Sequence, residues 1–232
     1  MISLLEAVGN ALANFLTKPR AVTSNLVRVS EVELLDTLRP ADVLLVDGNQ
    51  RISTAIKYLT QSTWSHAALY VGSGSLIEAD LKNGVVRVPL AKYSQMHTRI
   101  CRPIGLTSVD SEAVIQFAVY RLGHAYDLKN VFDLARYLLP TPPVPSTWRR
   151  SLLALGSGSP TRAICSTLIA EAFQSIKYPI LPTQEAERMR IRHHSLFTPR
   201  DFDISPFFEI VKPTLAMGFD YRRIEWAEGE PL

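Results

Sequence analysis

The stretch AICSTLIAEAF, residues 163–173, decides how the rest of the chain is interpreted. Its apolar residues recur at three- and four-residue steps, which is typical of a helix with one buried face. Cys165 lies beside this apolar stripe, near the start of the predicted helix. An unpaired cysteine is usually buried as inert packing, so the stretch alone favours a structural thiol over a nucleophile. The stripe consists of Ile164, Leu168, Ile169, Ala172 and Phe173.

The start of this helix controls how reactive Cys165 can be. Unpaired amide groups and the helix dipole stabilise a thiolate within the first turn. If Ser159 caps the helix and Pro160 is its first residue, Cys165 falls in the second turn and gains little. If the helix begins near Ala163, the stabilisation is much stronger. Both alternatives stay open at the level of the sequence.

A second stretch, WSHAALYVG at residues 64–72, predicts a strand that carries His66. Its neighbours are mostly apolar, and a lone histidine in such a strand is more often a buried core residue than a base. Two carboxylates, Glu78 and Asp80, favour a functional role for His66 because they lie on or just after the next predicted strand. We therefore expect a carboxylate beside His66.

The turn between these two strands decides which carboxylate faces His66. A turn centred on Gly72 places Glu78 directly opposite His66 in an antiparallel hairpin. A turn centred on Ser73 places Asp80 opposite, with Glu78 as the diagonal neighbour. Glycines on both sides of Ser73 permit either register, so both stay open here.

A cysteine, a histidine and a third polar group are what nucleophilic catalysis at a thiol requires. The thiolate attacks a carbonyl, the histidine pairs with it and later protonates the leaving group, and the third group orients the ring. Donors must also stabilise the oxyanion, and Tyr126 is a candidate donor. Packing at a helix junction is the more frequent role for such a tyrosine. Cys101, the other cysteine, is predicted to be structural because no nearby histidine is in phase with it.

Along the remaining chain, strands come first and helices follow, with one strand returning near the end, which predicts an α+β domain. Short spacings and glycine turns predict an antiparallel meander, since parallel neighbours need long crossovers. Thr107 or Ser108 is expected to cap a helix that stops at Gly123. The predicted strands are residues 43–46, 66–71, 76–79, 85–89, 98–102 and 207–211, and further helices are predicted over residues 52–59 and 127–138.

The composition argues against several classes of function. The chain has 232 residues with a formal net charge of +3, and its basic residues are scattered. The one basic run, residues 188–194, is typical of a solvated helix face, so we expect no nucleic-acid binding. Two cysteines make no disulfide framework and no metal-ligand spacing. We expect neither a metal nor a cofactor. The low cysteine content also fits a reducing compartment.

Residues 1–37 are predicted to form an N-terminal amphipathic helix and a linker, ahead of a main domain over residues 38–232. The helix is expected to pack on its own domain. The alternative is peripheral membrane contact through residues 1–20, which normally requires more basic residues than Lys18 and Arg20. Residues 1–20 lack the pattern of a signal peptide, and no apolar run is long enough to span a membrane, so we expect a cytoplasmic location.

Four segments together resemble one family. Residues 42–46, 64–72, 77–80 and 164–169 are similar to the circularly permuted branch of the NlpC-type papain-like superfamily, and within it to the YiiX/YaeF-like proteins. In the ordinary branch the cysteine helix precedes the histidine strand, whereas here the histidine comes first. The resemblance implies a permuted papain-like fold in which an antiparallel sheet or open barrel packs against a helical layer containing the cysteine helix.

The resemblance also implies roles for individual residues. Cys165 would be the nucleophile, His66 the base and Glu78 the orienting third member, which favours the turn centred on Gly72. The segment Gly123-His124-Ala125-Tyr126 is similar to the Gly-x-Pro-Tyr element of the family, with alanine in place of proline, and implies that Tyr126 lies near the oxyanion site.

The sequence therefore predicts a cysteine hydrolase of the amidase or peptidase kind that forms a thioester acyl-enzyme. Its substrate would be a small amide, a peptide or a lipid with an amide or ester bond. The alternatives are an acyltransferase or phospholipase-like activity on lipids, or a non-catalytic lipid- or peptide-binding module on the same fold. Hydrolysis and acyl transfer are not distinguished because both pass through the same acyl-enzyme.

Overall fold

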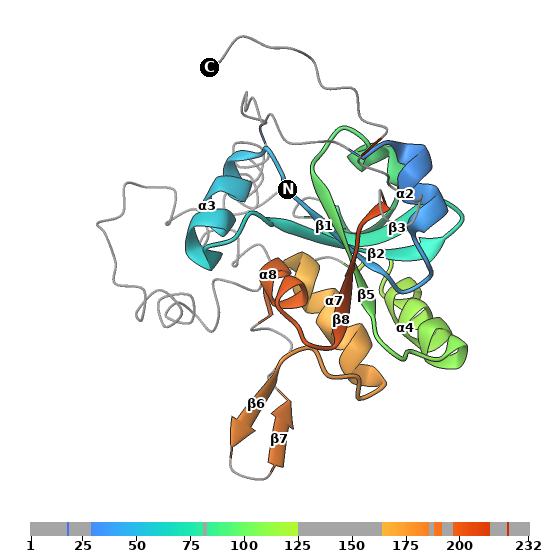
Figure 1. Ribbon diagram of the computed structural model, residues 1–232, viewed down its shortest axis with the longest axis vertical. Helices are drawn as coiled ribbons and strands as arrows, with labels where there is room; N and C mark the ends of the chain where they lie inside the picture. The colour runs from blue at the N-terminus through green and yellow to red at the C-terminus, as the bar shows by residue number, and fades with distance from the viewer. Residues whose placement is uncertain are drawn as a thin grey trace, which may run out of the picture.

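An antiparallel sheet lies at the centre of the part of the chain that the structure describes (Figure 1). This computed structural model describes residues 29–80, 83–124, 164–185, 188–191 and 197–213, together with residues 18 and 222. The strands of the sheet are β1 (Val43–Val46), β2 (His66–Gly72), β3 (Ser75–Asp80), β4 (Gly84–Pro89), β5 (Thr98–Pro103) and β8 (Phe208–Val211). Their order across the sheet is β4-β3-β2-β1-β5-β8.

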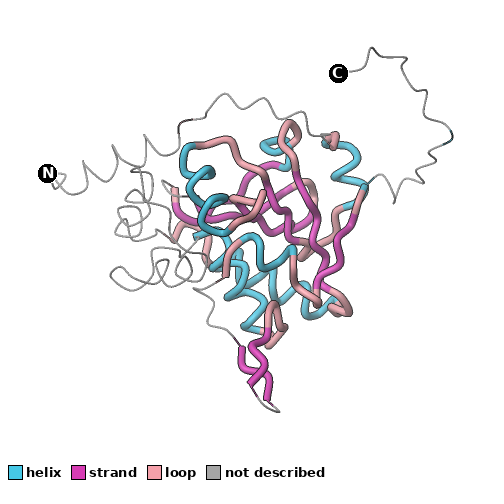
Figure 2. Tube along the Cα trace, turned by 60° about the vertical axis from the view of Figure 1, so that its left-hand side comes forward, coloured by secondary structure: helices cyan, strands magenta, loops and turns pink. Residues whose placement is uncertain are grey.

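Helices pack on the sheet, and with the strands they confirm the predicted α+β class (Figures 1 and 2). The described helices are α2 (Glu31–Thr37), α3 (Arg51–Thr60), the 3-10 helix η1 (Leu90–Tyr93), α4 (Ser108–Tyr120), α7 (Ile164–Ser175) and α8 (Pro199–Asp203). α7 contacts α4, β2 and β3, whereas α2 contacts η1. The sheet thus separates the layer that contains the cysteine helix from a smaller layer made by α2 and η1.

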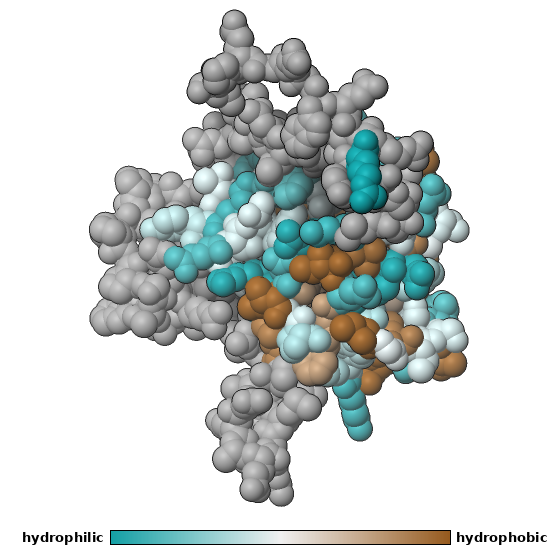
Figure 3. All heavy atoms as spheres, viewed as in Figure 1, coloured by the Kyte–Doolittle hydropathy of each residue, from teal (hydrophilic) through white to brown (hydrophobic). Residues whose placement is uncertain are grey.

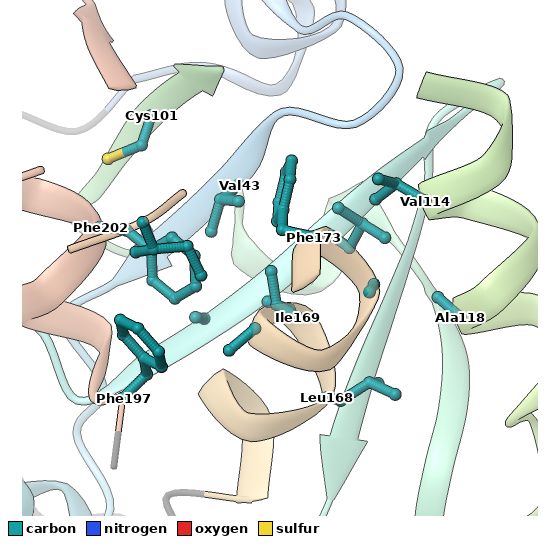
Figure 4. Packing of buried hydrophobic residues seen from close by; sticks show 14 of the residues in the cluster. Val43, Cys101, Val114, Ala118, Leu168, Ile169, Phe173, Phe197 and Phe202 are labelled. Carbon is teal, nitrogen blue, oxygen red and sulfur yellow. The ribbon is translucent and has the colours of Figure 1, made fainter. Parts of the chain in front are cut away.

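The larger hydrophobic core lies between the sheet and α7. Ile169 and Phe173 of α7 are fully buried, and Phe197 and Phe202 pack beside them (Figure 4). Each fully buried side chain of this size stabilises the fold by roughly 1.5–3 kcal/mol. This packing fixes α7 against β2, and with it the position of Cys165 near the start of β2.

The smaller core lies on the opposite face and includes a helix that the sequence analysis did not predict. Leu34 of α2 is buried there against Leu44 and Leu90. Ser30 begins α2 with a capping box, in which its hydroxyl accepts from the Glu33 N–H and the Glu33 carboxylate accepts from the Ser30 N–H. Residues before Leu38 therefore contribute to the packed body.

The predicted strands of the sheet, the helix at α3 and the helix at α4 are confirmed to within a few residues of their ends. The hydroxyl of Thr107 caps α4 by accepting from the Asp110 N–H at 3.1 Å. The predicted meander is only partly right, because β5 pairs with β1 and not with β4. After β4 the chain enters η1, whose Leu90 and Tyr93 are buried on the smaller core, and this crossing carries the chain to the far side of β1.

The prediction of a solvated helix face over residues 188–194 is wrong where the structure describes it. Residues Arg188–Ile191 form strand β7, which pairs with β6 (Pro182–Glu185) in a separate hairpin. Figures 1 and 2 show this hairpin projecting away from the sheet. The alternation of arginine with methionine and isoleucine in RMRI fits a strand, with its period of two, better than a helix.

Some predictions fall on residues outside the described ranges. These are the N-terminal helix within residues 1–20, the helix over residues 127–138, Tyr126, and residues 192–194 of the basic run. On the face shown in Figure 3, apolar side chains gather around the lower part of the described surface, among polar ones. Exposed large apolar residues of the described chain include Ile104, Val109, Ile204 and Ile210.

Candidate active site

Cys165 is the second residue of α7 and therefore lies in its first turn. The side chain is 5% exposed. The next residue, Ser166, donates its hydroxyl to the carbonyl of Phe197 at 2.8 Å, which fixes this end of the helix against the core. A thiolate in the first turn is stabilised by the unpaired amide groups and the helix dipole. Of the two alternatives for the helix start, the structure has the one that favours reactivity.

His66 is the first residue of β2 and lies opposite Val46 of β1. The paired residues of β2 and β3 end at Leu69 with Ile77, so the pairing does not reach as far as Ala67. The N–H of Ala67 and the His66 side chain instead lie close enough to the sulfur of Cys165 to lower the pKa of its thiol. The start of β2 thus supplies both an imidazole and a backbone donor to the thiol.

Glu78 contacts the other side of the imidazole. The distance from His66 Nε2 to Glu78 Oε2 is 3.1 Å, which leaves Nδ1 as the ring nitrogen that meets the sulfur. Glu78 is 1% exposed, whereas the His66 side chain is 23% exposed. The three side chains are therefore arranged in the order thiol, imidazole, carboxylate, with an opening toward solvent at the histidine.

The predicted turn centred on Gly72 is wrong, although Glu78 is the carboxylate that contacts His66. Tyr70 pairs with Leu76, which is the register of a turn centred on Ser73, and the register shifts between Tyr70 and Gly72. Ser73 and Gly74 both have positive φ and form a two-residue turn. Val71, which lies between the paired residues Tyr70 and Gly72, therefore bulges from β2.

In this register Glu78 reaches His66 from the diagonal position. The carboxylate of Asp80 accepts two hydrogen bonds from Asn83 at 2.9 Å each, one from its N–H and one from its side-chain amide. Asp80 therefore serves the turn before β4. The longer Glu78 side chain spans the diagonal spacing of the two strands.

Two residues that the sequence analysis did not single out complete the surroundings of Glu78. The Lys92 ammonium donates to Glu78 Oε1, and the Tyr93 hydroxyl donates to Oε2. Both come from η1, which follows β4 directly. Their spacing from Glu78 is set by the β3–β4 register and the turn into η1, and no motif in the sequence marks it.

These contacts shift the acidity of all three groups. Burial raises the pKa of the Cys165 thiol, but His66 and the N–H groups of Ala67 and Ser166 outweigh it and lower the pKa below its ordinary value. Burial also lowers the pKa of His66, yet Cys165 and Glu78 raise it to about 10. Both shifts favour the state in which Cys165 is a thiolate and His66 an imidazolium.

The charge of Glu78 is maintained against its burial. Burial raises the pKa of the carboxyl, and His66 together with Lys92 lowers it to about 2. The pKa of Tyr93 is raised, first by burial and then by the carboxylate of Glu78, so its hydroxyl stays a donor. Glu78 is thus an ionised acceptor throughout the neutral range.

The other residues named from the sequence lie apart from this arrangement or outside the described ranges. Cys101 is 0% exposed in β5, and burial raises its pKa, in keeping with the predicted structural thiol. Tyr126 lies outside the described residues, so its predicted place at the oxyanion site stays a prediction. The preceding residues are described: the Gly123 N–H donates to the carbonyl of Val85, and the Val85 N–H to the carbonyl of His124. That segment therefore runs beside the start of β4.

The fold and the site define an α+β protein with an open antiparallel sheet and a cysteine at the start of a packed helix. Among solved structures, the chain is similar to the crystal structure of YiiX from Escherichia coli O157:H7, which is described as a metalloprotein. The two share 15% sequence identity and a TM-score of 0.50, over 76% of this chain and 97% of the YiiX chain. The likeness confirms a YiiX-like fold, and the wider NlpC-type papain-like assignment stays a prediction. No protein-family model and no curated protein matches the chain.

Two features are absent from the described residues. Within them, no group of three or more histidine, cysteine, aspartate or glutamate side chains is arranged to hold a metal ion. None of the helices in the described ranges is both long and apolar enough to cross a membrane.

Proposed function

We propose that this protein is a cysteine hydrolase that cleaves an amide or ester bond through a thioester on Cys165. The observation that carries the proposal is the contact of a first-turn helix thiol with His66, whose other nitrogen lies 3.1 Å from the buried carboxylate of Glu78. An activated nucleophile, a base and an orienting group in contact are the recognised signature of nucleophilic catalysis.

The geometry supports the following sequence of bond changes. The Cys165 thiolate attacks the carbonyl carbon, and the carbonyl oxygen takes the electron pair. When the tetrahedral intermediate collapses, the bond to the leaving nitrogen or oxygen breaks, and the His66 imidazolium gives its proton to that atom. Water then attacks the thioester while neutral His66 takes its proton, which releases the acid and restores the ion pair.

Glu78 has a positioning role in this proposal. Its carboxylate accepts from His66 Nε2, so the ring presents Nδ1 to the sulfur throughout the cycle. Tyr126 remains the proposed side-chain donor to the oxyanion, on the basis of its resemblance to the family element. The acyl-enzyme permits transfer to an alcohol or amine as well as to water, so an acyltransferase on lipids is the same chemistry with another acceptor.

Trapping of the acyl-enzyme tests the proposal. Incubation with activated acyl esters and amides of varied chain length should add one acyl group to Cys165, detected by intact mass and peptide mapping. Cys165→Ala should abolish both the adduct and product release while circular dichroism stays unchanged. Cys101→Ala is the matched control and should keep both. A folded Cys165→Ala protein that still turns over substrate would exclude the proposal, and added hydroxylamine or an alcohol would distinguish hydrolysis from transfer.

A further inference from the structure

The Glu78 carboxylate is buried to an extent that requires partners. It is 1% exposed, and an isolated charge in such a place would take up a proton. His66 alone supplies one donor to one of its oxygens. The remaining hydrogen-bonding capacity of the carboxylate must be met by other groups if it is to stay ionised.

The second and third donors come from adjacent residues of η1. Lys92 donates to Oε1, while Tyr93 donates to Oε2, the same oxygen that faces His66. Because both oxygens are occupied from different directions, the carboxylate cannot rotate without breaking a charge-assisted bond. The orientation of Glu78 toward His66 is therefore set by η1 as well as by the sheet.

η1 is itself firmly held. Leu90 is 1% exposed in the smaller core, and its N–H donates to the carbonyl of Gly74 at 2.8 Å. The Met96 N–H donates to the carbonyl of Tyr93 at 3.0 Å, and α2 packs on this segment. A short helix with these anchors can fix the two donors without help from a long side-chain network.

Tyr93 also lies beside the histidine. The ring centroids of His66 and Tyr93 are 5.9 Å apart, and the Lys92 ammonium lies 5.2 Å from the Tyr93 ring. The tyrosine thus contacts the imidazole with its ring and the carboxylate with its hydroxyl. A residue that only filled the core would need neither the hydroxyl nor this place between the two groups.

We propose that Lys92 and Tyr93 are positioning residues of the site, which hold the Glu78 carboxylate ionised and oriented and thereby fix the His66 ring against Cys165. This inference rests on the proposed function. Lys92 supplies the compensating charge, so that two positive and two negative groups balance at the site. Tyr93 supplies a neutral donor that selects which oxygen meets the histidine.

The charges around the site agree with this division of roles. Burial raises the pKa of Glu78, and His66 and Lys92 together lower it. Among the described residues, the titratable groups that act on this set are Cys165 from α7 and Asp80 from β3, both of which help to raise the pKa of Tyr93. Neither supplies a positive charge, so Lys92 is the cation besides His66 that lowers the pKa of Glu78.

The first test measures the pH dependence of Cys165 alkylation by iodoacetamide, a neutral probe. In Lys92→Met, Glu78 should protonate at a higher pH, and the alkylation rate at pH 5 should fall about tenfold. Lys92→Arg keeps the charge and should restore most of the rate. Lys57→Met is the matched control, because Lys57 is a half-buried lysine that pairs with Asp47 at 2.5 Å, and its profile should follow the wild type.

The second test removes the neutral donor. Tyr93→Phe keeps the ring and should lower the alkylation rate about fivefold across the neutral range, since one bond to the carboxylate is lost. Tyr178→Phe is its control, because that hydroxyl donates to the carbonyls of Ile104 and Phe207. It should leave the rate unchanged. Melting temperatures of all variants separate a loss of positioning from a loss of fold.

A double-mutant cycle decides whether both residues act through Glu78. In a Glu78→Gln background, Lys92→Met and Tyr93→Phe should cause little further loss of alkylation rate. Losses that multiply in full would overturn the inference, as would Lys92 and Tyr93 variants with wild-type profiles. A second readout, the carboxyl carbon-13 titration of Glu78 by NMR, should show a higher pKa in Lys92→Met, and an unmoved titration would likewise overturn it.

These outcomes separate the inference from the function on which it rests. A wild-type Cys165 that reacts no faster than a free thiol would contradict the proposed function, while the NMR titration would still decide the roles of Lys92 and Tyr93. If the wild-type thiol is reactive and the Lys92 and Tyr93 variants behave like the wild type, this inference is contradicted and the proposed function is not.

Discussion

The two cysteines of this protein are both buried, yet their acidities are shifted in opposite directions. Cys101 is 0% exposed within β5, and Cys165 is 5% exposed at the start of α7. Burial raises the pKa of both thiols because it disfavours the charged form. Only at Cys165 do nearby groups reverse the effect, so that its pKa falls below the ordinary value.

The difference shows that burial alone does not make a thiol inert. Cys101 has charged neighbours, but the first of them is Asp203, a carboxylate, and it raises the thiol pKa further. Cys165 has an imidazole in contact and two backbone N–H donors. Arg99 lowers the pKa of Cys101 without outweighing burial, whereas the imidazole and the N–H donors at Cys165 do outweigh it, and this distinguishes the candidate nucleophile from a packing residue.

Removal of that partner should make Cys165 resemble Cys101, and this is the largest effect we expect. In His66→Ala, the thiol keeps its burial and loses its positive neighbour, so its pKa should rise. The alkylation rate of Cys165 at pH 7 should fall by about a hundredfold or more, in proportion to the lost thiolate. Stopped-flow or quenched alkylation with peptide mapping measures it.

His124→Ala is the control for this prediction, since that histidine is exposed and packs beside Tyr120 with 6.2 Å between ring centroids. It should react like the wild type. An alkylation rate in His66→Ala within a factor of about three of the wild type would show that the helix start alone activates the thiol.

The strand and the helix that bring His66 and Cys165 together could be predicted from the sequence, because local patterns identify strands and helices well. The mostly apolar run that follows His66 up to a glycine turn, and the apolar stripe beside Cys165, predict the strand and the helix that the structure has. The permuted order of the two segments supplied the resemblance to YiiX-like proteins, which the comparison of structures supports at the level of the fold.

The parts that local patterns missed depend on register and on long-range pairing. Glu78 was the favoured partner of His66, but through the wrong turn, because a bulge between Tyr70 and Gly72 changes the register by an amount that glycines alone do not specify. Lys92 and Tyr93 meet Glu78 only once β4 and η1 have folded back over β3. No fixed spacing along the sequence predicts such contacts.

The next largest effect concerns stability in acid. The folded pKa of Glu78, about 2, lies below its ordinary 4.5, so the ionised group stabilises the fold fully above pH 4.5. That contribution, about 3 kcal/mol, should be lost as the pH falls from 4.5 through 2. The gap in free energy of unfolding between wild type and Glu78→Gln should therefore shrink in acid, as measured by urea titrations from pH 3 to 7.

Asp42 provides a control of opposite sign. Its pKa is raised, because burial outweighs its bonds to Arg102 and to the Arg39 N–H. A raised carboxyl pKa means that the folded state takes up the proton more readily than the unfolded state, so the gap between wild type and Asp42→Asn should grow as the pH falls. Parallel slopes for the two variants would contradict the assigned charge states.

The smallest effect should come from the other thiol, and it completes the contrast. Cys101→Ala removes a buried sulfur that lies opposite Val43 in the β1–β5 pairing, so it should cost about 1 kcal/mol of unfolding free energy through lost packing. Cys101 contacts none of Cys165, His66 and Glu78. The pH profile of Cys165 alkylation should therefore keep both its midpoint and its plateau. Urea unfolding and the alkylation assay on the same preparation measure the two quantities together. A shifted Cys165 profile would mean that the sheet transmits strain from β5 to the start of β2 through their common neighbour β1, and the two thiols would then not be independent.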